Sequence, residues 1–254
     1  MIPLNRQTSE RVTAGLSEPG RSRAAHGLEV FEKLPMPDPR EEDWRYVDLD
    51  LDLDELALAE APGEQLPSRT DGASAAVGEV AGTAVNVDGF TIHADGLVPL
   101  REAEELSGPG IPADLDRFAA AAHAFGHDGV LLHVPAGTAV RKPYLVEFQA
   151  TAEGTVAFPR LVVHVEDGAE ASVLVDPRSP DGVELAVVPH FEVVAGTDSR
   201  VSLTLVQDWG DATVAIAQQR MVGGRDVALG LAEAGLGGAF ARLHLTIDLA
   251  GRGG

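Results

Sequence analysis

The stretch FPRLVVHVEDGAEASVLVD, from Phe158 to Asp176, decides the fold of this chain. It holds two short runs rich in valine and leucine, separated by a polar turn around Gly168. Short apolar runs of β-branched residues, bounded by Gly, Pro or Asp, are typical of β-strands. The stretch therefore predicts a strand, a tight turn and a second strand.

The same pattern of short apolar runs separated by polar turns continues from residue 128 to the end of the chain. Glycines recur at Gly137, Gly168, Gly196, Gly224 and Gly251, at intervals of 31, 28, 28 and 27 residues. A repeat of this length with two strands per unit favours the stacked coils of a parallel β-helix over four-stranded propeller blades. A β-sandwich with evenly spaced turns remains the alternative. The predicted strands are 130–134, 144–150, 161–165, 171–176, 183–188, 190–195, 201–207, 212–219, 226–234 and 243–250.

Residues 1–127 follow a different pattern and are expected to form a smaller helical or mixed region. Apolar residues at helical spacing predict helices over 21–33 and 112–125, the second beginning near Asp114. A segment rich in Gly, Ser, Pro and Ala near 62–80 predicts a linker. We therefore expect two regions, 1–127 and 128–254, the second being the β-helix core.

The amino-acid composition disfavours several classes of partner and of chemistry. The formal net charge of -21 disfavours nucleic acid and anionic membranes as partners. No apolar run approaches the roughly 18 residues of a membrane span, and the N-terminus lacks an apolar signal core, so a cytoplasmic location is expected. The absence of cysteine excludes disulfides, thiolate nucleophiles and thiolate ligation of an iron–sulfur cluster by this chain.

Four segments carry a resemblance to one family. EEDWRYVDL (41–49) resembles the E-x-W-R-Y-T-x-L motif of the SufD family, a component of the Suf system of iron–sulfur cluster assembly, with Val47 in place of the threonine. Segments 158–176, 188–207 and 237–251 resemble successive β-helix coils of that family. The paralogue SufB shares the β-helix but normally lacks the early motif, so SufD is the closer match.

The resemblance implies a right-handed parallel β-helix after a helical N-terminal region. It also implies a non-catalytic scaffold that acts with a SufB-like paralogue and a SufC-like ATPase, in a complex that handles the cluster while this chain alone binds no cofactor. Family chains are longer, so we expect this one to be truncated at its C-terminus. Its β-helix is then incomplete, and the main contact regions for both partners are missing.

The family motif raises a question of its own, because Trp44, Arg45 and Tyr46 stand beside many acidic residues. Asp48, Asp50, Asp52 and Asp54 alternate with leucines, which on a strand would place four carboxylates on one face and suggest a hard-cation site. The favoured interpretation is a solvated amphipathic turn, with Trp44 and Tyr46 as packing anchors and Arg45 paired to a nearby acid.

Histidines offer only weak metal candidates. His133 and His164 each precede a repeat glycine by four residues, so stacked coils would place one imidazole above the other. The favoured interpretation is structural, because His190 and His244 do not keep that offset. His123 and His127 stand four residues apart without the glutamate of H-E-x-x-H.

Two further function classes remain open. A carbohydrate-active β-helix enzyme would need paired carboxylates, for which Glu166, Asp167 and Asp176 are candidates. A purely structural β-helix interaction module would differ from the scaffold only in its partner. The chain has no phosphate-binding G-x-x-x-x-G-K-[ST] loop and no G-x-S-x-G elbow, so no catalytic residues are predicted and we expect no enzyme.

Overall fold

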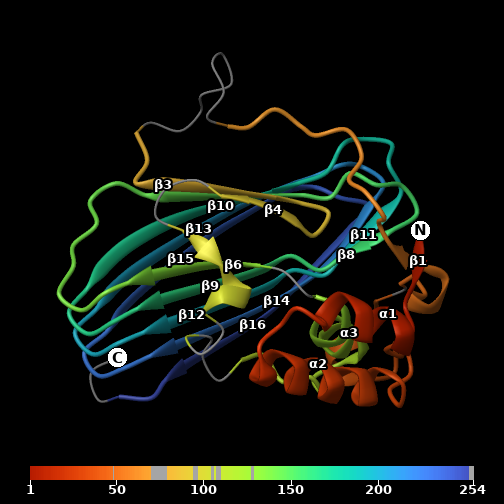
Figure 1. Ribbon diagram of the computed structural model, residues 1–254, viewed down its shortest axis with the longest axis horizontal. Helices are drawn as coiled ribbons and strands as arrows, with labels where there is room; N and C mark the ends of the chain where they lie inside the picture. Colours follow the sequence, from red (N-terminus) through yellow and green to blue (C-terminus); the bar gives the residue numbers. More distant parts are fainter. Residues whose placement is uncertain are drawn as a thin grey trace.

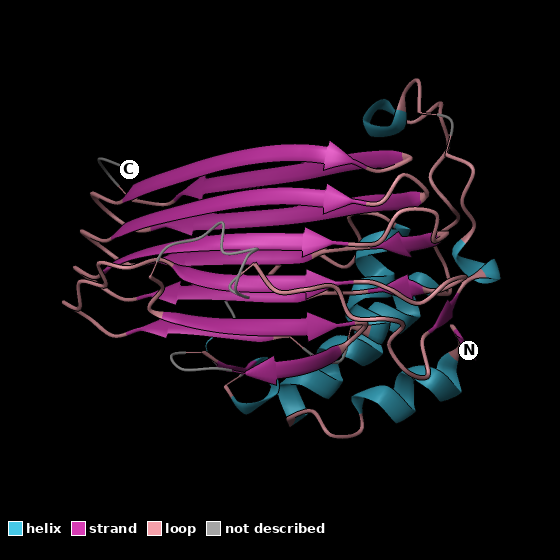
Figure 2. Cartoon of the chain, turned by 90° about the horizontal axis from the view of Figure 1, so that it is seen from above, coloured by secondary structure: helices cyan, strands magenta, loops and turns pink. Residues whose placement is uncertain are grey.

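The computed structural model describes residues 1–47, 49–69, 79–93, 97–103, 106, 110–126 and 129–251. It is mainly β, as predicted: residues 130–249 form a β-solenoid of about four turns, and three α-helices lie before it. Figure 1 shows the long strands running side by side, with the helices gathered near one end of the stack. Figure 2 shows the same strands from above, as a regular stack of rungs.

Two sheets form the walls of the solenoid. The strand order of the first is β15-β13-β10-β7-β3-β4, and that of the second is β5-β6-β9-β12-β14-β11-β8, with β16 paired to β14. The strands of the first sheet are β3 (Gly82–Val87), β4 (Phe90–His93), β7 (Tyr144–Gln149), β10 (Glu170–Arg178), β13 (Arg200–Trp209) and β15 (Ala228–Gly237). Those of the second are β5 (Val98–Pro99), β6 (Val130–Val134), β8 (Val156–Ala157), β9 (Arg160–Val165), β11 (Leu185–Val187), β12 (His190–Ala195), β14 (Thr213–Gly223) and β16 (Phe240–Leu249).

Successive coils pair in parallel, which confirms the repeat. Leu203 of β13 lies between Val173 of β10 and Leu231 of β15, each about one coil away in sequence. Every strand predicted from the glycine repeat is present. Strands β3 and β4 were not predicted; β3 adds to the first sheet in parallel with β7.

The recurring glycines let the coils approach closely at one corner. A Cβ built on Gly196 would stand 2.6 Å from the backbone nitrogen of Asp167, one coil below. A Cβ on Gly224 would stand 2.9 Å from the backbone nitrogen of Thr197. These distances are shorter than a side chain tolerates, so Gly196 and Gly224 are required for steric reasons, whereas Gly137 and Gly168 have positive φ angles of 70° and 67° that favour glycine.

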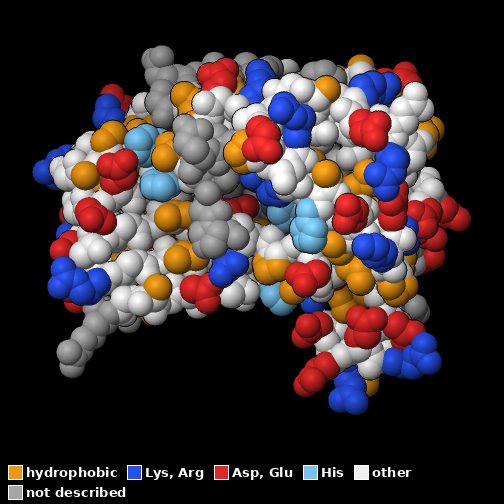
Figure 3. All heavy atoms as spheres, turned by 60° about the horizontal axis from the view of Figure 1, so that its bottom comes forward, with side chains coloured by type: hydrophobic (Ala, Val, Ile, Leu, Met, Phe, Trp, Pro, Cys, Tyr) orange, Lys and Arg blue, Asp and Glu red, His pale blue; other side chains and the backbone are white. Residues whose placement is uncertain are grey.

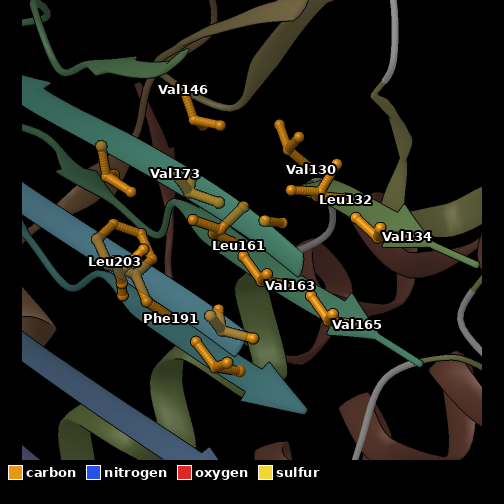
Figure 4. Packing of buried hydrophobic residues seen from close by; sticks show 14 of the residues in the cluster. Val130, Leu132, Val134, Val146, Leu161, Val163, Val165, Val173, Phe191 and Leu203 are labelled. Carbon is orange, nitrogen blue, oxygen red and sulfur yellow. The ribbon is translucent and has the colours of Figure 1, made fainter. Parts of the chain in front are cut away.

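The space between the two sheets is filled by valine, leucine and phenylalanine. Figure 4 shows Val130, Leu161, Val173, Phe191 and Leu203 pointing into this interior from both walls. Phe148 and Phe191 stack with ring centroids 5.3 Å apart. Alternating inward-facing side chains thus give the solenoid one continuous apolar core.

The helices cover the outer face of the second sheet through a separate core. They are α1 (Arg6–Thr13), α2 (Glu18–Phe31) and α3 (Arg117–Phe125). Phe31, Phe118 and Phe125 pack there against Phe158 and Ile216 of the solenoid. Apolar faces of helices stabilise a domain only where they find such a surface.

Helix boundaries differ from the predictions. The second predicted helix begins later, because the Asp116 side chain accepts a hydrogen bond from the Ala119 amide and acts as the N-cap. The first helix begins earlier, with Ser17 as N-cap and Pro19 in its first turn. Helix α1 was not predicted, since its short polar sequence has little helical periodicity.

Short elements connect these layers. They are the 3-10 turns η1 (Glu42–Trp44), η2 (Leu53–Glu55) and η4 (Leu100–Glu102), and the antiparallel pair β1 (Ile2–Pro3) with β2 (Ala57–Leu58). The predicted linker falls partly on residues 70–78, outside the described residues. The boundary at residue 127 stays a prediction.

A strap formed by residues 63–69 crosses the outer face of the first sheet. Gln149 exchanges two hydrogen bonds with the backbone of Leu66, at 2.9 and 3.1 Å. The Arg69 guanidinium donates to Asp176 at 3.0 Å and to Asp208 at 2.6 Å. Within the described part of the chain, no helix is long and apolar enough to cross a membrane.

Candidate functional site

The two histidines predicted to stack do lie one above the other. His133 pairs with His164 in the register of β6 and β9, and their rings meet edge to face with centroids 5.7 Å apart. His133 Nε2 lies 2.8 Å from Glu166 Oε1, and His164 Nδ1 lies 2.8 Å from the Leu106 carbonyl oxygen. Histidine side chains (pale blue) gather at two places on the face shown in Figure 3.

This pair does not amount to a metal centre. Its hydrogen bonds to Glu166 and Leu106 use one nitrogen of each ring. The hydrogen bond from His133 is the main reason that the pKa of the Glu166 carboxyl lies below its usual value. Among the residues that the structure describes, no three His, Cys, Asp or Glu side chains come together in a way that could hold a metal ion.

The remaining histidines are separated from this pair. His123 of α3 meets His190 of β12 edge to face, with ring centroids 5.5 Å apart. His244 of β16 is the register partner of Gln218 on β14. The Gln218 side chain is hydrogen-bonded to His190. His127 lies outside the described residues, so the predicted pairing of His123 with His127 stays a prediction.

The carboxylates considered for glycoside chemistry are occupied and do not converge. Glu166 also accepts a hydrogen bond from the Ala136 amide at 3.0 Å, and Asp167 accepts one from the Thr197 amide at 2.7 Å. Asp176 lies on the other sheet, bound by Arg69 at 3.0 Å and Arg178 at 2.8 Å. Two carboxylates facing a shared space, as glycoside hydrolysis requires, are not formed by these three residues.

The family motif divides into a buried and an exposed part. Trp44 is 3% exposed and stacks on Phe118 with ring centroids 5.6 Å apart. The expectation that Tyr46 is a packing anchor is wrong: it is 92% exposed and has a positive φ of 67°. This left-handed backbone turns the side chain away from the core, and the guanidinium of Arg45 lies 5.7 Å over its ring.

The alternating aspartates form no cation site in the described residues. Asp52 caps the short turn η2 through a hydrogen bond from the Asp54 amide, at 2.9 Å. Asp54 accepts a hydrogen bond from Arg117 of α3, at 2.6 Å. The favoured interpretation, a solvated turn, describes these two residues, and Asp48 lies outside the described residues.

A polar network under the helices was missed by sequence reasoning. Gln218 of β14 donates to the Asp116 carboxylate at 2.8 Å and is hydrogen-bonded to His190. Burial lowers the pKa of His123 to about 4, lowers that of His190 well below its usual value and raises that of Asp116. The two imidazoles are therefore neutral at pH 7.

Polar side chains also lie in the solenoid interior near β15. Trp209 Nε1 donates to Gln207 at 3.1 Å, and the Gln207 amide is hydrogen-bonded to Glu233. Gln219 donates to Glu233 at 3.4 Å. Desolvation raises the pKa of the Glu233 carboxyl. These residues could have been found in the sequence as polar residues at inward-facing strand positions: Gln207, for example, continues the two-residue spacing of the buried Leu203 and Leu205.

Comparisons with known proteins point to one family. Residues 148–254, which hold most of the solenoid, match the family described as SUF system FeS cluster assembly, SufBD core domain. Iron–sulfur cluster assembly SufBD family proteins of Mycobacterium bovis and of two strains of Mycobacterium tuberculosis are each 25% identical over 249 residues. Each match covers 94% of this chain, which spans 57% of the length of these relatives.

Proposed function

We propose that this chain is a member of the SufBD family and serves in the SUF system of iron–sulfur cluster assembly as a SufD-like, non-catalytic scaffold component. The observation that carries the proposal is the overlap of the family match, residues 148–254, with the parallel solenoid. The cluster is the cargo of this system and not a resident cofactor of the chain.

The lack of cysteine supports a scaffold role. Iron–sulfur clusters are held mainly by cysteine thiolates, and the chain has none. A cysteine-free subunit can instead present a rigid surface to other subunits that do carry thiolates. The coils are fixed by continuous parallel pairing from β6 to β16, which provides such rigidity.

The early motif supports the SufD-like assignment within the family. Trp44 anchors the segment 41–47 to the helical core and to β16, so the motif has a structural role. In this proposal a SufB-like paralogue and a SufC-like ATPase are the partners. A cytoplasmic location is part of the same proposal.

Reconstitution with and without this chain tests the role. The chain, extended to the full gene product where a longer one exists, is mixed with the paralogue and the ATPase, and cluster transfer to an apo-acceptor is measured. We expect transfer to fall when this subunit is omitted and the ATPase to co-purify with it. Unchanged transfer in its absence would contradict the proposal.

A structural interaction module with other partners is the second candidate. Capture from the native source distinguishes the two, because a module unrelated to cluster assembly would not retain the ATPase and the paralogue. The carbohydrate-active alternative has no geometric support, since Glu166, Asp167 and Asp176 are engaged in separate contacts.

A further inference from the structure

A groove of about 720 Å³ runs along one corner of the solenoid. One of its walls is made by turn residues of four successive rungs, which are Gly154, Glu184, Ala212 and Ala239. The other wall is segment 49–56 of the N-terminal region. Neighbouring rungs lie about 4.8 Å apart, so four rungs give the groove a length of about 14 Å.

The segment opposite the turns follows the axis of the stack. Asp43 lies next to β16, because its carbonyl oxygen accepts a hydrogen bond from Arg242 at 3.2 Å. Ala57 forms a parallel bridge with Thr155, which directly precedes β8. The chain between Asp43 and Ala57 therefore passes from the rung of β16 to the rung of β8, and both walls of the groove follow the same direction.

The deeper part of the groove is apolar. Three half-buried leucines of the segment line it, and they also pack against the core under the helices; they are Leu49, Leu51 and Leu56. From the solenoid, the half-buried Val214 of β14 and the buried Leu185 of β11 complete this floor. Apolar surface that is rimmed by polar residues and open to solvent is typical of a site where another protein binds.

The rim of the groove carries only negative charge. The carboxylates that line it belong to four exposed residues, Asp50, Asp52, Glu55 and Glu184. No lysine, arginine or histidine is among the described residues that line the groove. Asp52 accepts a hydrogen bond from the Asp54 amide, and within the described part of the chain none of the four carboxylates forms an ion pair. The rim therefore attracts a positively charged partner.

We propose that this groove docks a short extended segment of another protein, in which lysine or arginine alternates with leucine or isoleucine. Each residue of an extended chain advances about 3.3 Å, so about four to five residues span the groove. Alternate side chains then enter the leucine-lined floor. The long basic side chains between them reach the carboxylates on both sides of the rim, because their aliphatic stems can lie along apolar surface.

Other occupants fit the groove less well. A second copy of this chain carries the same net charge of -21 and offers no excess of basic residues. Nucleic acid and anionic membranes meet repulsion from the carboxylates. A metal ion would leave the apolar floor uncovered, and no three His, Cys, Asp or Glu side chains of the described residues are placed to hold one.

Titration calorimetry with hexapeptides capped at both ends tests the proposal on the unaltered chain. The probes are KLKLKL, KSKSKS, which lacks the apolar side chains, and ELELEL, which reverses the charge. We expect KLKLKL to bind at least about tenfold more tightly than KSKSKS, because only its leucines bury apolar surface in the floor. We expect no binding of ELELEL.

Three results of this titration would overturn the proposal. Equal affinity for KLKLKL and KSKSKS would show unspecific attraction to a negative surface. Binding of ELELEL as tight as that of KLKLKL would show that the carboxylates do not select the partner. The third is the absence of saturable binding of KLKLKL up to about 1 mM.

Two double variants localise the binding. Glu55→Gln with Glu184→Gln removes one carboxylate from each wall and should weaken KLKLKL binding at least about fivefold at low salt. Glu10→Gln with Glu29→Gln is the matched control, because it changes the net charge equally at exposed helix positions outside the groove. Circular dichroism checks that both variants fold. Equal affinity of the two folded variants for KLKLKL would place the peptide elsewhere and overturn the assignment.

The full gene product, where a longer one exists, is titrated with the same peptide. We expect it to bind KLKLKL with an affinity similar to that of the 254-residue chain. A longer chain that does not bind the peptide would mean that its own residues cover the groove, which would overturn the docking of another protein.

Discussion

Arg242 of β16 lies over the indole ring of Trp44, with its guanidinium carbon 4.1 Å from the ring centroid. The same guanidinium donates to the Asp43 carbonyl oxygen at 3.2 Å. A cation over an aromatic face is attracted by about 0.5–2 kcal/mol, depending on burial. The contact joins the family motif of the N-terminal region to the solenoid rung formed by β16.

Trp44→Ala should reduce the free energy of unfolding by about 3–5 kcal/mol, because it deletes a buried aromatic and its contacts with Phe118 and Arg242. Denaturant unfolding followed by circular dichroism measures the change. Tyr46→Ala is the matched control, with an expected change within about 0.5 kcal/mol at its exposed position. Similar effects of the two substitutions would contradict the anchoring role of Trp44.

A buried ion pair under the strap gives a second prediction. Glu147 is fully buried and accepts hydrogen bonds from Arg178 at 2.7 Å and from the Arg69 amide at 2.8 Å. Arg178→Met leaves a buried carboxylate short of a partner and should cost about 3–5 kcal/mol in unfolding experiments. Adding Glu147→Gln should recover part of this loss.

The control for that pair is Arg200→Met, which breaks the exposed pair with Glu170. Exposed pairs contribute at most about 1 kcal/mol, so its effect should be small. A double variant no more stable than Arg178→Met would show that the uncompensated charge is not the cause.

The corner glycines give a steric prediction. Gly196→Ala places a Cβ 2.6 Å from the backbone of Asp167, and rigid backbone cannot move aside cheaply. We expect a loss of about 1–3 kcal/mol in the free energy of unfolding, as for other overpacked sites. Gly235→Ala is the control, because nothing lies within 4 Å of its added Cβ. A harmless Gly196→Ala would mean that the coils can separate at this corner.

His123 should make stability depend on pH. Its pKa is about 4 in the folded chain against 6.5 when unfolded, so the unfolded state binds the proton more readily. Stability is therefore highest above pH 6.5 and falls as the pH drops towards 4, by about 3 kcal/mol in all. The charged or titratable groups that face this ring are Arg23, His26, Arg160 and His190.

His123→Gln removes this titration and keeps a donor for the Ile111 carbonyl. Unfolding measured between pH 4 and 8 should show a shallower slope for the variant. The raised carboxyl pKa values of Asp116 and Glu192 act in the opposite direction, and they cancel in the comparison of the two proteins. Parallel curves would assign the pH dependence to other groups.

We predict that the 254-residue chain self-associates through strands β15 and β16. Each pairs with one neighbour among the described strands, and the apolar side chains of β16 are exposed. These side chains are Leu243, Leu245, Ile247 and Leu249. Unpaired apolar strands template association, and the net charge of -21 opposes it less as salt rises.

Light scattering across a salt series measures this association. Leu245→Lys with Ile247→Lys should reduce it, whereas Thr246→Lys on the opposite strand face should reduce it less. A monodisperse monomer at high salt would mean that this face does not pair with a second copy.

The solenoid could be predicted from the sequence because it is determined mainly by short local patterns of residues. Gly168, Gly196 and Gly224 each stand at a corner where coils touch, and the strands between them follow from valine-rich runs. The buried polar face under the helices could not be predicted in this way. His190 and Glu192 occupy outward positions of a strand, where a polar residue normally indicates solvent, and only the packing of α2 and α3 turns that face into an interior. Tyr46 was misplaced because its left-handed backbone is not visible in an aromatic-rich motif.

The parallel pairing of each rung with the one before it has a consequence for synthesis. A strand such as β13 pairs with β10, which lies about 30 residues earlier in the chain and has therefore been synthesised before β13. At about 5–20 residues per second, one coil of about 28 residues emerges every few seconds, far slower than microsecond strand pairing. Folding can therefore proceed coil by coil as translation advances, with each finished rung serving as the template for the next. The contact between Trp44 and Arg242 can form only after β16 has been synthesised, so the N-terminal segment reaches its final position late.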